Sequence, residues 1–278
     1  VQPDESTPLI ALKGCAYLLL DLPHARGRIF ADVDLMTTGE QLESVEARLN
    51  ARGWETASLT PYDDHYYRRW THELPPLKHA EREMEIDLHH NLLPRTARLK
   101  PDARKLLASS RAVPGSRYRV LASEDMVLHA MTHLMYADDL ADKLRELVDI
   151  ADLIDYFTER EPGFWDRFLQ RAPELDLARP AFYALRYLHR LLGNEIPTRV
   201  REEARAWGPP AGVLSVMDRI VPRALFPQHP DHHSRLTEAA RWPLYIRSHW
   251  IRMPPWLLAY HLSYKFAATR LRPRRQAD

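Results

Sequence analysis

The stretch Ile29-Phe-Ala-Asp32-Val-Asp34-Leu35 decides how this chain is interpreted. Apolar residues occupy every second position, and alternation with period two is typical of a β-strand with one buried face. Asp32 and Asp34 then share the other face, about 6.6 Å apart along the strand. Two carboxylates on one face repel each other, and burying them without a partner is costly. A divalent cation between them would remove that cost.

A second acidic strand is predicted at Met84-Glu-Ile-Asp87-Leu-His-His90, where apolar residues again alternate with polar ones. If the two strands are neighbours, Asp87 converges with Asp32 and Asp34. Such an oxygen-only set suits Mg²⁺ or Mn²⁺ rather than Zn²⁺. For an isolated Asp-Val-Asp, a solvated strand face is the commoner explanation, and the second acidic strand is what favours a metal.

A strand, a turn and a helix precede these two strands. Pro8-Leu-Ile-Ala-Leu12 is a short apolar run that stops at Lys13-Gly14, which predicts a buried strand and a tight turn. A short helix follows over Cys15–Leu22 and ends at Pro23. Backbone N–H groups at the start of such a helix favour an anion whatever the side chain.

The remaining periodicity predicts two domains. A helix over 39–52 ending at Gly53, strands over 54–59 and 71–77, and a loop containing Asp63-Asp64-His65 complete the first part. Beyond Pro114-Gly115 the pattern is helical, with segments starting at Ser123 and covering 140–157, 180–192, 197–206, 211–221, 236–250 and 256–271. We expect an α/β (α+β) domain with a short mixed sheet over 1–115, followed by an α-helical domain over 116–278.

Composition excludes several classes of protein. The 278 residues include 39 Lys+Arg against 38 Asp+Glu, so the chain is not a generally polybasic nucleic-acid binder. The single cysteine excludes a disulfide framework and a Cys-rich zinc module, and a reducing, cytoplasmic setting fits best. No apolar run approaches ~20 residues, so no transmembrane segment is expected. The chain begins at Val1, which leaves open whether N-terminal sequence is missing, and the oligomeric state is also open.

The order of these motifs resembles the nucleotidyltransferase superfamily typified by DNA polymerase β. The resemblance is closest to a bacterial family of largely uncharacterised nucleotidyltransferases and covers roughly residues 9–155. It rests on four motifs: Leu12-Lys-Gly14, Arg28, Ala-Asp32-Val-Asp34-Leu and Glu85-Ile-Asp87-Leu-His89. The superfamily often has Gly-Ser at the turn, whereas this chain has Gly14-Cys15 and so lacks a hydroxyl contact to phosphate.

The resemblance implies a role for each motif. The Gly14 turn and the Cys15 amide would contact the phosphates of the nucleotide. Asp32 and Asp34 would bind metal, and Asp87 would bind the catalytic metal and help to activate the acceptor hydroxyl. The cations Lys13 and Arg28 would add positive charge near the triphosphate, although surface or structural salt bridges explain them equally well.

Four further residues are candidates for the substrate cleft: His89, His129, His133 and Arg145. The two histidines on the predicted helix are spaced i, i+4, as zinc ligands can be, but the sequence lacks the Glu of the metalloprotease motif. Polar contacts between domains explain them as well. For Arg145 the simplest explanation is an i, i+4 ion pair with Asp149.

These observations lead to three hypotheses. The first is a Mg²⁺-dependent nucleotidyltransferase that moves a nucleoside monophosphate from an NTP such as ATP to a hydroxyl or phosphate acceptor. That acceptor is a small molecule, a peptide or protein, or an RNA such as tRNA. The second is a non-catalytic nucleotide-binding or interaction module on the same fold. The third is a zinc hydrolase built on His89, His129 and His133.

The C-terminal segment Trp256–Leu271 is aromatic-rich and runs into arginines at 270, 272, 274 and 275. An anionic lipid surface, a tRNA or a protein partner would suit it. An amphipathic terminal helix with a frayed basic tail is the simpler interpretation.

Overall fold

A seven-stranded mixed sheet forms the first part of the molecule. The computed structural model describes residues 8–27, 32–79, 81, 82, 84–228 and 234–271, with side chains up to residue 264. Arg28 and the arginines at 272, 274 and 275 lie outside the described residues, as does the side chain of Arg270. The sheet has the order β3-β4-β5-β2-β1-β7-β6. Its strands are β1 (Ile10–Ala11), β2 (Asp32–Met36), β3 (Trp54–Thr56), β4 (Leu77–His79), β5 (Glu85–His89), β6 (Arg111–Ala112) and β7 (Arg119–Val120).

The centre of the sheet carries both predicted acidic strands. β2 and β5 are parallel neighbours, in a register that pairs Asp34 with Asp87 and Asp32 with Glu85. On the other side β2 pairs antiparallel with β1, which pairs in parallel with β7. The apolar residues of β1 are completely buried, as the short apolar run predicts. The proposed boundary at residue 115 stays a prediction, and the last sheet strand, β7, lies beyond it.

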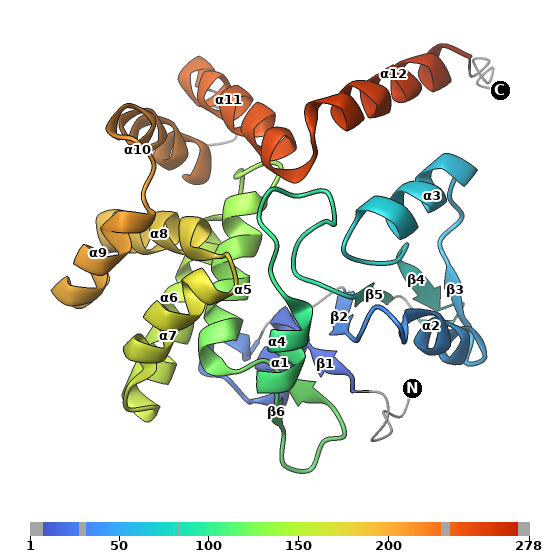
Figure 1. Cartoon of the computed structure of the whole chain (residues 1–278), viewed down its shortest axis with the longest axis horizontal. Coiled ribbons are helices and arrows are strands. Elements are labelled where there is room, and N and C mark those ends of the chain that lie inside the picture. Colours follow the sequence, from blue (N-terminus) through green and yellow to red (C-terminus); the bar gives the residue numbers. More distant parts are fainter. Residues whose placement is uncertain (1–7, 28–31, 80, 83, 229–233, 272–278) are drawn as a thin grey trace.

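In the part of the chain that the structure describes, the α-helices accompanying the sheet are α1 (Lys13–Leu19), α2 (Leu42–Asn50), α3 (Pro61–Trp70) and α4 (Ala103–Ser109). Figure 1 shows α2 and α3 at the β3–β4 end of the sheet, on the opposite side of the molecule from α6 to α10. The turn after α2 contains Gly53 at φ +81°, a left-handed conformation that favours glycine. This agrees with the prediction that the helix ends at Gly53.

Two parts of the predicted secondary structure are wrong. Asp63-Asp64-His65 lies in α3 rather than in a loop. The helix begins there because the Thr60 hydroxyl accepts a hydrogen bond from the Asp63 amide (3.1 Å), Pro61 occupies the first turn, and both aspartates complement the helix dipole. The strand expected at 71–77 begins only at Leu77, and residues 72–74 instead run beside the end of β5.

The second part is helical, as expected. Its helices are α5 (Ser123–Tyr136), α6 (Leu144–Arg160), α7 (Phe164–Glu174), α8 (Ala178–Tyr187), α9 (Thr198–Ala204), α10 (Ala211–Leu225), α11 (Arg235–Arg252) and α12 (Pro255–Leu271). A π-helical turn, Leu188–Leu192, ends α8 at Gly193, where φ is +74°. Buried residues occupy almost every position of α5, which packs against α6, α7 and α8. This central helix therefore joins the sheet to the other helices.

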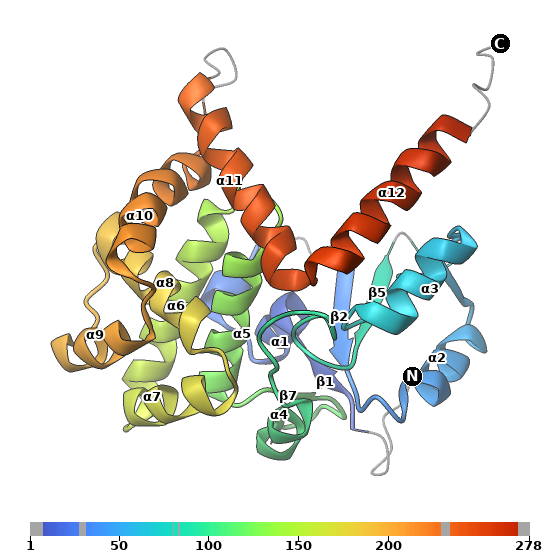
Figure 2. The same ribbon diagram turned by 45° about the horizontal axis from the view of Figure 1, so that its top comes forward.

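The last two helices diverge from a common point, as Figure 2 shows. α11 packs against α10, and α12 runs beside α3 of the sheet-bearing part. The Tyr62 ring on α3 stacks on Tyr264 at 3.7 Å, and the Tyr62 hydroxyl shares a 3.0 Å hydrogen bond with His261 Nδ1. α12 thus brings residues from the end of the chain into contact with α3, which lies at the β3–β4 end of the sheet. Across the described ranges, no helix has the length and apolar character needed to cross a membrane.

Candidate active site

Three carboxylates meet at the centre of the sheet. Asp32 and Asp34 project from the same face of β2, and the parallel register places Asp87 of β5 beside them. Each of the three offers an oxygen within 4.8 Å of the others. Asp34 is only 3% exposed, Asp87 is half-buried and Asp32 faces solvent. The predicted convergence of the two acidic strands is therefore present.

Asp34 is held by two nitrogen donors. Lys13 Nζ lies 2.8 Å and His89 Nε2 lies 2.9 Å from the same oxygen, Oδ1. Burial alone would raise the pKa of Asp34, but the His89 hydrogen bond and the Lys13 charge outweigh it and hold the pKa well below its usual range. Burial likewise opposes the charge on Lys13, yet its contact with Asp34 leaves the Lys13 pKa raised. Both groups are charged at neutral pH.

Lys13 reaches this position from a strained backbone. It is the first residue of α1 and has φ +42°, in the left-handed region that side chains other than glycine rarely adopt. The tight turn from β1 into α1 places its ammonium over β2. Such strain, of order 1–3 kcal/mol, is concentrated at functional sites in proteins.

Asp87 differs electrostatically from Asp34. Burial, followed by the nearby carboxylates of Glu73 and Asp34, raises the pKa of Asp87 to about 6. The three carboxylates on β2 and β5 therefore carry more negative charge than the Lys13 ammonium can neutralise. An oxygen-rich group of this kind has the chemistry of a site for a hard divalent cation.

A second cluster adjoins the carboxylates. His72 Nε2 lies 3.7 Å and His89 Nδ1 lies 3.4 Å from Glu73 Oε2. The segment bearing His72 and Glu73 is fixed beside β5, because the Leu74 amide donates to the Leu88 carbonyl and the His90 amide to the His72 carbonyl. Burial holds the pKa of His72 well below its usual value, so this ring is neutral at pH 7.

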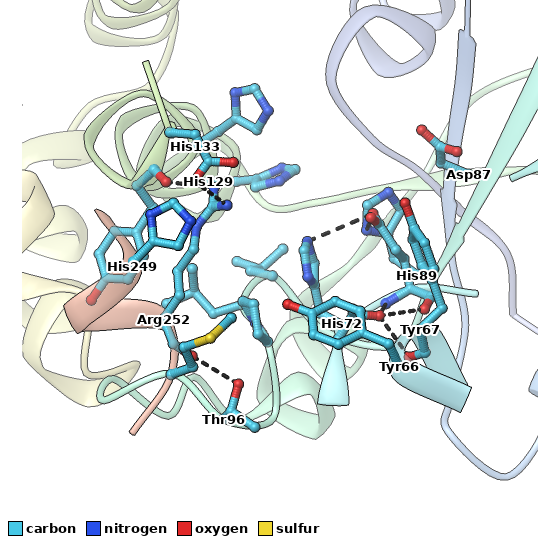
Figure 3. A pocket seen from close by; sticks show the side chains of 18 of the residues that line it. Tyr66, Tyr67, His72, Asp87, His89, Thr96, His129, His133, His249 and Arg252 are labelled. Carbon is cyan, nitrogen blue, oxygen red and sulfur yellow. Dashed lines mark hydrogen bonds and ion pairs between the residues drawn. The ribbon is translucent and has the colours of Figure 1, made fainter. Parts of the chain in front are cut away.

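Two cavities flank the carboxylates. The larger, of about 650 Å³, lies between the sheet, α3, α5 and the junction of α11 with α12 (Figure 3). Six histidines line it: His72, His89, His129, His133, His249 and His261. The smaller, of about 380 Å³, lies between α1, α5 and α6 and is lined by Gly14, Lys143 and Glu146 among others. Lys13, Asp32 and His133 line both cavities, so the acidic cluster lies where they meet.

The remaining predicted site residues have different surroundings. Gly14 is buried at the start of α1 and lines the smaller cavity. Cys15 is half-buried against the core, and burial raises the pKa of its thiol. His129 is buried in the wall of the larger cavity, whereas His133 is partly exposed and lies 3.1 Å from Glu146 Oε2. Arg145 is exposed and lines neither of these cavities.

Sequence reasoning missed several residues of the site. His72 and Glu73 belong to the segment 71–77, which the sequence predicts to be a strand. Tyr66 and Tyr67 lie on helix α3, where the sequence predicts a loop. Arg252 comes from the end of α11, where its guanidinium donates to the Tyr136 carbonyl and, at 2.8 Å, to Asp138 Oδ1. A Thr60-Pro61 helix-start signal was present for α3, but no local signal marks a residue brought in by tertiary packing.

Comparison with known protein families bears on what this site does. Residues 4–193 match the model of a family described as uncharacterised nucleotidyltransferase. The chain belongs to this family. The match includes both acidic strands, α1 and the helices α5 to α8, and it supports nucleotidyl transfer as the general function. A search of curated proteins and a search of solved structures each found no match.

Proposed function

We propose that this nucleotidyltransferase moves a nucleoside monophosphate from an NTP, such as ATP, to a hydroxyl or phosphate of an acceptor and releases pyrophosphate. The observation that carries the proposal is the convergence of Asp32, Asp34 and Asp87 between two cavities. One cavity can hold a donor while the other holds an acceptor. The proposed acceptor is a small molecule, a peptide or protein, or an RNA.

The three carboxylates fit a Mg²⁺ or Mn²⁺ site. They supply only oxygen ligands, and the pKa of Asp87 is raised by burial and then by the neighbouring carboxylates of Glu73 and Asp34, whose charge a divalent cation would neutralise. When bound, such ions neutralise phosphate charge and lower the pKa of a coordinated hydroxyl. Lys13 and His89 would keep Asp34 ionised and in a fixed orientation for this purpose.

We place the donor in the smaller cavity. The start of α1, with Gly14 and the Cys15 amide, lies beside that cavity and would face the phosphates, and Arg28 is proposed to add charge there. The acceptor would occupy the larger cavity, which His129 and His133 help to line.

The proposed reaction is an in-line displacement at the α-phosphorus. The acceptor oxygen forms a bond to phosphorus, the bond to the bridging oxygen of the β-phosphate breaks, and pyrophosphate leaves with that electron pair. When the acceptor is a hydroxyl, its proton passes to an Asp87 carboxylate oxygen, since Asp87, with a pKa of about 6, is a stronger base than Asp34, which is bonded to Lys13 and His89.

Transfer from labelled NTPs into a cell extract tests the activity. The wild-type chain should label a product and release pyrophosphate, and Asp32→Ala should abolish both with little change in folding, because Asp32 is exposed. Asp152→Ala is a matched control, since it removes an exposed carboxylate on α6 that lines neither cavity. Full turnover in a folded Asp32→Ala protein would disprove the assignment.

Calorimetry with each NTP tests the metal requirement separately. We expect tight binding only when Mg²⁺ or Mn²⁺ is present, because the acidic cluster repels a triphosphate that carries no cation. Binding without metal and without pyrophosphate release would instead favour a non-catalytic nucleotide-binding module.

A further inference from the structure

The cluster of His72, Glu73 and His89 lies on the wall of the larger cavity, beside the acidic cluster but distinct from it (Figure 3). Its three candidate ligand atoms lie within 4.8 Å of one another. Two imidazole nitrogens and one carboxylate form the donor set of many zinc and other transition-metal sites. The three aspartates, in contrast, offer oxygen alone.

The spacing of these atoms suits coordination better than hydrogen bonding. Zn–N and Zn–O bonds of about 2.0–2.1 Å in tetrahedral geometry separate neighbouring ligand atoms by about 3.4 Å. The observed separations from Glu73 Oε2 are 3.4 Å to His89 Nδ1 and 3.7 Å to His72 Nε2. Both exceed the usual length of an N–H···O hydrogen bond.

The hydrogen bonding of His89 provides a second, independent observation. His89 is 2% exposed, and its Nε2 must donate to Asp34, because an ionised carboxylate can only accept. Its other nitrogen, Nδ1, is also buried, and this atom has no hydrogen-bond partner in the described part of the chain. This nitrogen points at Glu73 Oε2 from 3.4 Å, which is too far for a usual N–H···O hydrogen bond, and a metal ion between the two atoms would satisfy both.

We propose that His72, Glu73 and His89 bind a first-row transition-metal ion, with Zn²⁺ as the expected occupant. The ligands are His72 Nε2, a Glu73 carboxylate oxygen and His89 Nδ1. Asp34 would be the carboxylate that orients His89 through its other nitrogen, an arrangement common around metal-bound histidines. Three protein ligands leave a fourth position, and all three residues line the cavity from which water or substrate could fill it.

This site differs from the zinc hypothesis drawn from sequence. Among the described residues, the metal-capable groups within 4.8 Å join His89 to His72 and Glu73, not to His129 and His133. The new site also does not depend on nucleotidyl transfer, because Mg²⁺ is held by other residues in the proposed reaction.

Cobalt binding to the full chain tests the proposal. The chelator-treated protein is titrated with Co²⁺ in excess Mg²⁺, which occupies the acidic cluster, and the visible absorption of imidazole-bound Co²⁺ is followed. We expect one equivalent to bind and to be displaced by Zn²⁺. His72→Ala and Glu73→Gln should weaken Co²⁺ binding by more than about 100-fold, since even losing a residue that only orients a ligand costs 10–100-fold.

Two control variants distinguish this site from its surroundings. His249→Ala removes another histidine of the same cavity and Asp32→Ala removes an acidic-cluster ligand, and both should keep the cobalt spectrum. Thermal unfolding checks that each variant folds. If His72→Ala does not fold, Glu73→Gln alone tests whether the metal site exists. No cobalt spectrum in the wild type, or an unchanged spectrum in Glu73→Gln, overturns the proposal. Loss of transfer in Asp32→Ala with cobalt retained would show that the two sites are separate.

Discussion

At the scale of single residues, Asp34 has two tasks that its neighbours on the sheet do not share. It is a proposed metal ligand, and it is also the buried partner of Lys13 and His89. Asp32, two positions earlier on the same strand, is exposed. Substitutions at the two positions should therefore affect activity alike and stability differently.

We expect Asp34→Ala to lower the free energy of unfolding by about 3 kcal/mol, because it leaves the Lys13 ammonium without its 2.8 Å partner. Asp32→Ala should change it by less than about 0.5 kcal/mol, as surface substitutions usually do. Urea unfolding followed by circular dichroism measures both. Equal losses at the two positions would show that the Lys13–Asp34 pair contributes little to folding.

The buried side chain of His129 leads to a prediction of how folding stability depends on pH. Burial, followed by the charge of Lys13, holds its pKa well below 6.5. Below pH 6.5 His129 therefore binds a proton in the unfolded chain but not in the folded chain. The free energy of unfolding then falls as the pH is lowered, by up to about 1.4 kcal/mol per pH unit for this group.

His129→Gln should make the loss of stability between pH 6.5 and 5 less steep than in the wild type. Part of the slope should remain, because the pKa of His72 is also depressed by burial. Urea unfolding at several pH values provides the comparison, and an unchanged slope would mean that His129 does not carry the effect.

At the scale of elements, local periodicity determined what could be predicted. Alternation in β2 and β5 assigned the faces of Asp34 and Asp87 correctly, because a period of two leaves only one choice of face. The same reasoning missed α3, since Asp63-Asp64 resembles a turn until the capping by Thr60 is taken into account. It also missed His72 and Glu73, whose backbone pairs with β5 only through the tertiary structure.

The contact between α3 and α12 leads to a prediction at this scale. Tyr62→Ala removes the ring that stacks on Tyr264 and the hydroxyl that bonds to His261. Backbone amides of residues 255–264 should exchange hydrogen faster, while those of α5 should not change. Tyr67→Ala is the matched control, because Tyr67 lies on the same helix and faces the larger cavity. Equal effects of the two variants on α12 would contradict a specific role for Tyr62.

For the whole molecule, the site is assembled from segments far apart in the chain. The sheet supplies the carboxylates, and α5, α11 and α12 supply the opposite wall of the larger cavity through His129, His249 and His261. Sequence alone predicted a carboxylate-bearing part followed by a helical part. It could not predict that the last two helices return to the site, because that depends on packing between residues about 200 positions apart.

Ligand binding should therefore stabilise the molecule as a whole. With Mg²⁺ and an NTP at about 100 times its Kd, the free energy of unfolding should rise by about 2.7 kcal/mol and Tm by roughly 5 °C. Removing Mg²⁺ with EDTA should reverse the shift. Asp87→Asn should show little of it, whereas Asp152→Ala should behave like the wild type. A full shift in Asp87→Asn would place the metal elsewhere.

The left-handed backbone of Lys13 has an evolutionary consequence. Glycine at this position would relieve the strain at φ +42°, yet it would also remove the ammonium that bonds to Asp34. Losing that ion pair costs about 3 kcal/mol, which equals or exceeds the roughly 1–3 kcal/mol of relieved strain, so selection for stability and selection for catalysis both favour lysine here. A screen for more stable variants should therefore retain lysine there, and Lys13→Gly should lower both the free energy of unfolding and the transfer activity.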